Sequence, residues 1–150
     1  MPTVCYEIET DVQPEDLMAV ITDFARYPDF IPTMKQVRLA LQGPPVWEVR
    51  FILQIIRRME YVLRLEQHGP HELSWSLLEG VFLHNSGSWK LKPLDSGTHI
   101  CYTLTMQLET FLPNSIALSL EQHSLPATVG YFIEEARRRH ARQRSAPAEH

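Results

Sequence analysis

The sequence has few cysteines and no long apolar run, and each absence excludes a class of protein. Its two cysteines, Cys5 and Cys101, form no C-x-x-C motif, so neither a zinc site nor a thioredoxin-like redox site is indicated. Their spacing leaves open whether they meet in the fold. No apolar stretch approaches the ~20 residues that a membrane-spanning helix requires. The first residues lack the charged and apolar regions of a signal peptide, so we expect a cytoplasmic protein.

The common motifs of metalloenzymes, hydrolases and nucleotide-binding proteins are also missing. The seven histidines form neither H-x-H nor H-E-x-x-H, so we predict no metal site and no cofactor. Residues 85–89 lack the second glycine of the nucleophile elbow, and no glycine-rich loop is present to hold a phosphate. The net charge of −4 argues against general binding to nucleic acids, which usually requires a basic surface.

The C-terminal end differs in charge from the rest of the chain. Residues 136–150 contain five arginines and one acid. Cations at the end of a helix interact favourably with its dipole and keep that end soluble, and this is the favoured interpretation. The alternative is peripheral contact with an anionic membrane or with a ribosome. The arginines that would make such a contact are Arg137, Arg138, Arg139 and Arg142.

Alternating apolar and polar residues predict seven strands joined by short turns. In the clearest case, Trp47 and Phe51 share one face while Glu48 and Arg50 share the other. We place the break between the third and fourth strands at 56–58, although no glycine marks it. The predicted strands cover residues 4–9, 37–41, 47–55, 59–66, 73–79, 81–92 and 100–108.

Two short helices are predicted after the first strand. Pro14 and the acid that follows it mark the start of the first helix, whose apolar residues continue to Phe24. The stretch 27–32 is rich in aromatic residues and contains two prolines, which favours a second short helical turn and then an exit.

A long helix is predicted from Pro113 to Arg142. Pro126 lies inside it, and an interior proline removes one backbone hydrogen bond. We therefore expect either a bend there or two helices, the second capped by Ser124. The apolar residues recur at helical spacing and predict one buried face. That face contains Leu125, Val129, Phe132 and Ile133.

These elements predict an α+β fold in a single domain, residues 1–143, followed by a disordered tail, residues 144–150. Strands joined by short turns form an antiparallel sheet, and a strongly twisted sheet of this size tends to curl. The long amphipathic helix is the partner available for its apolar face. We predict a seven-stranded curled antiparallel sheet wrapped around the C-terminal helix, with two short helices after the first strand.

Three segments resemble those of a known family. Residues 23–32, DFARYPDFIP, are similar to the early signature of START-like (SRPBCC) proteins of the polyketide cyclase/dehydrase and coenzyme Q-binding type. Residues 86–91 resemble their G-x-W-x-L segment, and residues 111–113 resemble their entry to the last helix. The resemblance implies a helix-grip fold with a deep apolar cavity between sheet and C-terminal helix. Members bind lipids, quinones or polyketides, some are aromatase/cyclases, and one branch is described as ribosome-association toxins.

The apolar face of the predicted sheet is rich in aromatic residues. The pattern alone favours a packed core. The resemblance implies instead a cavity that binds a quinone, a lipid or a polyketide-like compound. The protein would then transport or chaperone this compound. The stretch 27–32 would then form part of the entrance. The predicted ligand-binding residues are Tyr27, Phe30, Trp47, Phe51, Tyr61, Leu63, Trp75, Trp89, Tyr102, Leu104, Leu125, Val129, Phe132 and Ile133.

The alternative function is catalysis, as a polyketide cyclase, aromatase or dehydratase. Such a reaction needs a base for an acidic carbon proton and a donor for the enolate oxygen. The candidate catalytic residues are Tyr61, Tyr102 and His84. Counting along the strand points Asn85 rather than His84 inward, but a bulge at Gly87 would reverse this. A second alternative is a ribosome-associated interaction protein that uses the terminal arginines.

Overall fold

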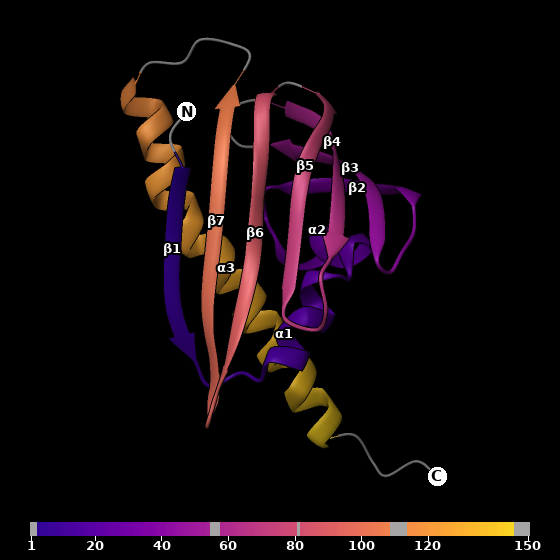
Figure 1. Ribbon diagram of the computed structural model, residues 1–150, viewed down its shortest axis with the longest axis vertical. Coiled ribbons are helices and arrows are strands. Elements are labelled where there is room, and N and C mark those ends of the chain that lie inside the picture. The colour runs from indigo at the N-terminus through magenta and orange to yellow at the C-terminus, as the bar shows by residue number, and fades with distance from the viewer. Residues whose placement is uncertain (1–2, 55–57, 81, 109–113, 146–150) are drawn as a thin grey trace.

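The computed structural model describes residues 3–54, 58–80, 82–108 and 114–145. Seven strands form one antiparallel sheet, which curls around the long helix α3 (Asn114–Ser145) (Figure 1). The predicted α+β helix-grip fold is confirmed. The strands are β1 (Thr3–Thr10), β2 (Met34–Leu41), β3 (Val46–Gln54), β4 (Arg58–Gln67), β5 (Glu72–Gly80), β6 (Phe82–Leu94) and β7 (Gly97–Leu108). Their order across the sheet is β1-β7-β6-β5-β4-β3-β2.

The strands alternate between buried and exposed side chains, as the sequence predicts. In the β3–β4 hairpin, Phe51 is paired with Tyr61, and both side chains are buried on the inner face of the sheet. Register shifts interrupt the pairing in β2, between β4 and β5 and at the start of β6, and such irregularities bend a sheet. The predicted break at 56–58 falls largely outside the described residues, since β3 ends at Gln54 and β4 begins at Arg58.

The first helix, α1 (Pro14–Ile21), is shorter than predicted. The hydroxyl of Thr22 donates to the carbonyl oxygen of Met18 at 2.8 Å, and the chain turns there. Phe24 then starts a separate 3-10 turn, η1 (Phe24–Arg26), which leads directly into α2 (Tyr27–Phe30). The prediction that the first helix continues to Phe24 is therefore wrong, while the short second helix is confirmed.

Helix α3 runs unbroken from Asn114 to Ser145 and contains Pro126. The predicted division into two helices, with Ser124 as the cap of the second, is therefore wrong. The proline removes one backbone hydrogen bond, but Leu125 and Val129 on either side of it are 4% and 0% exposed. Packing of this stretch keeps the helix continuous. The helix also includes the start of the predicted tail, and residues 146–150 lie outside the described ones.

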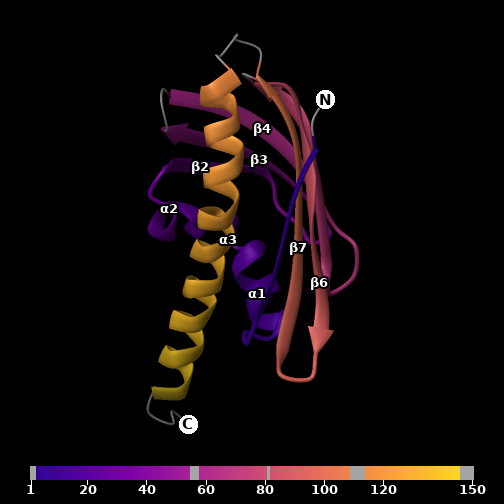
Figure 2. The same cartoon turned by 90° about the vertical axis from the view of Figure 1, so that its left-hand side faces the viewer.

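Helix α1 fills one end of the space between α3 and the sheet. It packs against both α3 and β6, and its Leu17 and Ile21 are fully buried (Figure 2). Beside it, the ring of Phe24 meets that of Trp47 edge-on, with 5.3 Å between centroids. This end is a packed core. The other end, under residues 125–132 of α3, is not filled in this way, and a cavity lies there.

Candidate functional site

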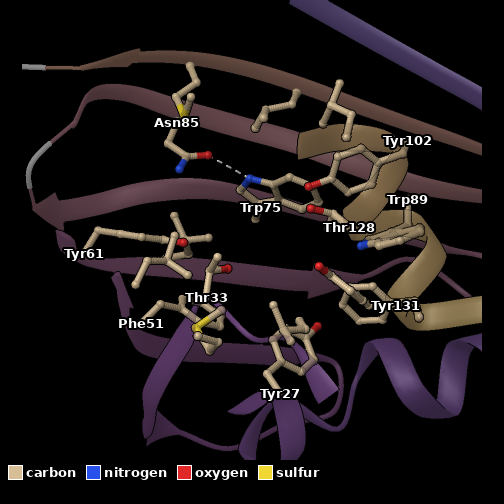
Figure 3. A pocket seen from close by; sticks show the side chains of 18 of the residues that line it. Tyr27, Thr33, Phe51, Tyr61, Trp75, Asn85, Trp89, Tyr102, Thr128 and Tyr131 are labelled. Atoms are coloured by element: carbon tan, nitrogen blue, oxygen red, sulfur yellow. Dashed lines mark hydrogen bonds between the residues drawn. The ribbon is translucent and has the colours of Figure 1, made fainter. Parts of the chain in front are cut away.

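A cavity of about 360 Å³ lies between the sheet and α3, a volume typical of small-molecule sites. Its walls come from strands β2 to β7, from α2 and the residues that connect it to β2, and from one side of α3 (Figure 3). Segments far apart in the sequence thus enclose it, and most of the wall is apolar. The predicted ligand-binding residues that line it are Tyr27, Phe51, Tyr61, Leu63, Trp75, Trp89, Tyr102, Leu104, Leu125 and Phe132.

Four predicted ligand-binding residues are buried but do not line the cavity: Phe30, Trp47, Val129 and Ile133. Trp47 is covered by η1, and Phe30 packs edge-on against Phe132. Val129 and Ile133 each follow a wall residue by one position, and a helix turns by about 100° per residue, so they face the packed core instead. The structure places these four side chains outside the described cavity wall, and their part in ligand binding stays a prediction.

The ring of Phe132 joins α3 to both sides of the cavity. Its centroid lies 5.1 Å from that of Tyr27, 5.4 Å from that of Phe30 and 4.9 Å from that of Trp89. Trp89 in turn meets Tyr102 at 4.6 Å. All four contacts are edge-on, which the ring quadrupoles favour. These five residues, called the aromatic cluster below, therefore hold α3 in place over the cavity.

A hydrogen-bonded pair of polar side chains lies on the opposite wall. The indole Nε1–H of Trp75, on β5, donates to the Oδ1 of Asn85, on β6, at 3.0 Å (Figure 3). Asn85 is only 5% exposed, and it occupies the inward phase of β6, as counting along the strand predicts. A polar residue on an apolar wall requires a partner, and Trp75 supplies one.

His84 points away from the cavity. The pairing of β6 with β7 is regular from His84 to Leu94, so Gly87 forms no bulge, and the register shift lies earlier, between Phe82 and His84. The imidazole Nε2 lies 2.9 Å from the Oγ of Ser86, outside the cavity wall. The interpretation that turned His84 inward is therefore wrong, and the structure gives this residue no place in chemistry inside the cavity.

Three buried tyrosines bring hydroxyl groups to the wall. The hydroxyl of Tyr27 donates to the backbone carbonyl of Ile21. Burial raises the pKa of both Tyr61 and Tyr102 well above the usual value of 10. Both hydroxyls are therefore protonated at neutral pH, which suits them to donating hydrogen bonds and not to removing protons. Their role in catalysis stays a prediction.

Several wall residues lie outside the predicted set. Thr128 and Tyr131 follow Leu125 at intervals of three, so helical spacing was the signal that could have identified them. Thr33 lies between α2 and β2, where no periodicity indicates which way a side chain points. For Asn85, the sequence indicates an inward direction only as the alternative to His84. The remaining wall residues are apolar: Ile31, Met34, Leu53, Met59, Leu65, Leu73, Met106 and Ala127.

Among the residues that the structure describes, no charged side chain lines the cavity. The polar groups on this part of the wall are hydroxyls, indoles and the amide of Asn85. The part of the chain that the structure describes contains no group of three His, Cys, Asp or Glu side chains that could bind a metal ion. A charged ligand would lose its hydration without gaining a partner, so the described wall fits an uncharged, largely apolar molecule.

The C-terminal arginines pair with acids, and Glu135 is at the centre of these pairs. Burial alone would raise the pKa of Glu135, but hydrogen bonds from Arg139 and Arg138 outweigh it, and the pKa lies below its usual value. The shortest pairs are Arg137 with Asp11 (2.8 Å), Arg138 with Glu135 (2.9 Å), Arg139 with Glu135 (2.9 Å) and Asp23 (3.1 Å), and Arg142 with Glu135 (3.5 Å).

Two of these pairs, to Asp11 and Asp23, connect α3 to the residues that flank α1. The arginines therefore have a structural role. Their contact with a ribosome or a membrane surface stays a prediction, and none of the described helices combines the length and apolarity needed to cross a membrane.

Cys5 and Cys101 meet on neighbouring strands, β1 and β7. Their Sγ atoms lie 3.4 Å apart, and both are free thiols. Neither lines the cavity between sheet and helix. The hydrogen bond with Cys101 raises the pKa of Cys5 above its usual value. The structure thus answers the question that the spacing of the two cysteines leaves open.

Comparison with known proteins is consistent with this architecture. The family model described as polyketide cyclase / dehydrase and lipid transport matches residues 10–130. A START superfamily protein from Mycobacterium smegmatis is 16% identical, with 91% of this chain and 97% of that chain covered and a TM-score of 0.80. The ZhuI aromatase/cyclase from Streptomyces sp. R1128 is 18% identical, with 92% and 94% covered and a TM-score of 0.78.

A STAR-related lipid transfer protein fragment from Xanthomonas axonopodis is 13% identical, with 90% of this chain and 85% of that chain covered and a TM-score of 0.74. At such identities the likeness to solved structures shows the fold alone. No curated protein sequence matches the chain significantly.

Proposed function

We propose, from the premise that the chain belongs to the polyketide cyclase / dehydrase and lipid transport family, that its cavity binds a hydrophobic small molecule. The ligand is a quinone, a lipid or a polyketide-like compound, which the protein transports or chaperones. The observation that carries this proposal is the apolar cavity of about 360 Å³ between the sheet and α3, next to the aromatic cluster.

The affinity for such a ligand comes mainly from apolar surface removed from water. At ~25 cal/mol per Å², a ligand that buries ~250 Å² of its apolar surface gains ~6 kcal/mol before the cost of immobilising it is subtracted. The few polar groups on the wall then fix the orientation of the ligand rather than supply most of the affinity.

Catalysis as a polyketide cyclase is supported less well by the described wall. Ring closure needs a base near neutral pH as well as a donor. The wall offers donors, in Asn85, Tyr61 and Tyr102, but among the described residues it has no imidazole or carboxylate. If the protein is a cyclase, Tyr61→Phe or Tyr102→Phe should abolish turnover while binding survives. Turnover unchanged in both variants would remove these two residues as candidates.

The proposal is tested by what the protein carries and rebinds. We expect denaturing organic extraction of freshly purified protein to release about one equivalent of an uncharged apolar compound, identified by mass spectrometry. Delipidated protein should then rebind an alkyl-substituted benzoquinone. At a free concentration of ~100 times its Kd, such a ligand stabilises the fold by about 2.7 kcal/mol. This corresponds to a rise in Tm of roughly 5–11 °C for a domain of this size.

A matched pair of variants tests whether the ligand binds in the cavity. Leu104 lines the cavity, whereas its neighbour Thr103 does not, because successive side chains of a strand point to opposite faces. We expect Leu104→Trp to fold, as judged by circular dichroism, and to lose the thermal shift, while Thr103→Val keeps it. Clean extracts together with no rebinding by the delipidated wild type would refute the proposal.

A further inference from the structure

The amide of Asn85 is a polar group on the mostly apolar wall of the cavity. We infer that the ligand is an uncharged compound with a carbonyl oxygen, and that the amide nitrogen of Asn85 donates a hydrogen bond to that oxygen. This inference rests on the proposed function and deepens it, because it names a chemical group on the ligand and the residue that recognises it.

The orientation of the amide follows from its partner. An indole N–H can only donate, so the atom of Asn85 that faces Trp75 must be the acceptor, Oδ1. The two hydrogens of Nδ2 are then left on the other side of the amide. Figure 3 shows the nitrogen turned away from Trp75 and toward the interior of the cavity. Among the residues that the structure describes, none accepts a hydrogen bond from Nδ2.

Asn85 is only 5% exposed, but among the described residues no fully buried side-chain nitrogen or oxygen lacks a partner, so Nδ2 keeps access to the open space of the cavity. A donor that is covered by a ligand and left without a partner is costly, and a ligand that supplies an acceptor avoids that cost. A ligand without an acceptor would instead cover the donor and leave it unsatisfied. The wall therefore discriminates between two apolar molecules of the same shape according to whether one of them carries an acceptor at this position.

Gly87 allows Trp75 to hold the amide in this orientation. The two residues are paired across β5 and β6. A Cβ at Gly87 would lie 2.5 Å from Cζ2 of Trp75 and 2.2 Å from the carbonyl oxygen of Thr103, so no side chain fits there. The missing side chain makes room for the indole, whose Nε1 then reaches Asn85 two residues before Gly87 on the same face of β6. Trp75 is thus a positioning residue.

A carbonyl oxygen is the ligand group that matches this donor. It accepts and does not donate, as the amide nitrogen requires. A ligand hydroxyl would bring a hydrogen that needs its own acceptor, and a carboxylate would bring a charge that no described wall residue balances. Quinones and polyketide-like compounds carry neutral carbonyl groups on an apolar body, whereas an ionised fatty acid does not.

Two compounds of nearly equal shape test the inference: fluorenone, which carries one carbonyl, and fluorene, which carries none. The dissociation constant of each is measured on delipidated protein. In Asn85→Leu, we expect the preference for fluorenone over fluorene to fall by about five- to tenfold relative to wild type. In Trp75→Phe the amide can rotate, so we expect a smaller fall in the same ratio. His84→Ala changes the neighbouring residue, which points outward, and should leave the ratio unchanged.

The infrared carbonyl band of bound fluorenone gives a second readout that does not depend on a variant. A hydrogen bond from Asn85 lowers the frequency of this band in wild-type protein relative to fluorenone in an apolar solvent. Binding of both compounds with the same ratio in Asn85→Leu, or an unshifted band in wild type, overturns the inference and leaves the proposed function standing. Failure of both compounds and of the alkyl-substituted benzoquinone to bind, together with clean extracts, overturns the proposed function, and this inference with it.

Discussion

Replacing Phe132 by alanine tests whether the aromatic cluster anchors α3 over the cavity. The ring is 3% exposed and meets three other rings edge-on, at 5.1 Å, 5.4 Å and 4.9 Å. Truncation of a buried phenylalanine to alanine costs roughly 3–5 kcal/mol. We expect a loss of about 3 kcal/mol, at the lower end, because one side of the ring borders the cavity and has fewer packed atoms to lose.

The assay is equilibrium unfolding in urea, with thermal unfolding as a check. The midpoint should fall without a change in the m-value, and Tm should fall by roughly 6–12 °C for a domain of this size. Phe132→Leu keeps most of the burial but removes the rings' edge-on contacts, and should cost about 1 kcal/mol. Tyr131→Ala is a control on the same wall, where the side chain is only half-buried. A loss below ~1 kcal/mol in Phe132→Ala would refute the anchoring role.

Three further predictions concern charge and redox chemistry away from the cavity. The pKa of Glu135 is lowered in the folded state. Its carboxylate therefore stabilises the fold at pH values above its usual pKa of 4.5, and this stabilisation is lost as the pH falls through the folded-state pKa. Glu135→Gln should therefore lower the free energy of unfolding in urea by about 1 kcal/mol at pH 7, a modest loss because the arginines are partly exposed. In acid the same variant should lose nothing, and equal losses at both pH values would contradict the prediction. A hydrogen bond with Glu7 raises the pKa of His99, so an NMR titration should give a value above 6.5 that falls in Glu7→Gln; no change in that variant would exclude the pairing. Oxidised glutathione should convert Cys5 and Cys101 into an intrachain disulfide with release of two molecules of reduced glutathione, seen as a mass lower by two hydrogens; stable glutathione adducts on both would show that the thiols do not meet.

The fold could be predicted because each strand signals its buried face locally. Alternation around Phe51 and Tyr61 depends only on neighbouring residues, and the hairpin pairs these two side chains as that alternation requires. The buried face of α3 is likewise indicated by the spacing of apolar residues within the helix itself. Local patterns fail where packing between elements decides the structure. Pro126 predicts a break in the helix, but the buried residues on either side of it keep the helix continuous.

The division of the inner face into cavity and core could not be predicted in this way. Trp47 and Trp75 have the same pattern in sequence, but η1 covers Trp47, whereas among the described residues no comparable turn covers Trp75. The direction of His84 depends on where the register of β6 shifts, which no single residue marks. Likewise, the acid that pairs with Arg137 is Asp11, more than a hundred residues away in sequence.

The most direct test of ligand binding in the cavity uses the protein's own tryptophans. Trp75 and Trp89 line the cavity and Trp47 does not. Titration of delipidated protein with an alkyl-substituted benzoquinone, a quencher of indole fluorescence, should give quenching that saturates at about one equivalent and persists in Trp47→Phe. Quenching that never saturates, or that disappears in Trp47→Phe, would contradict the account.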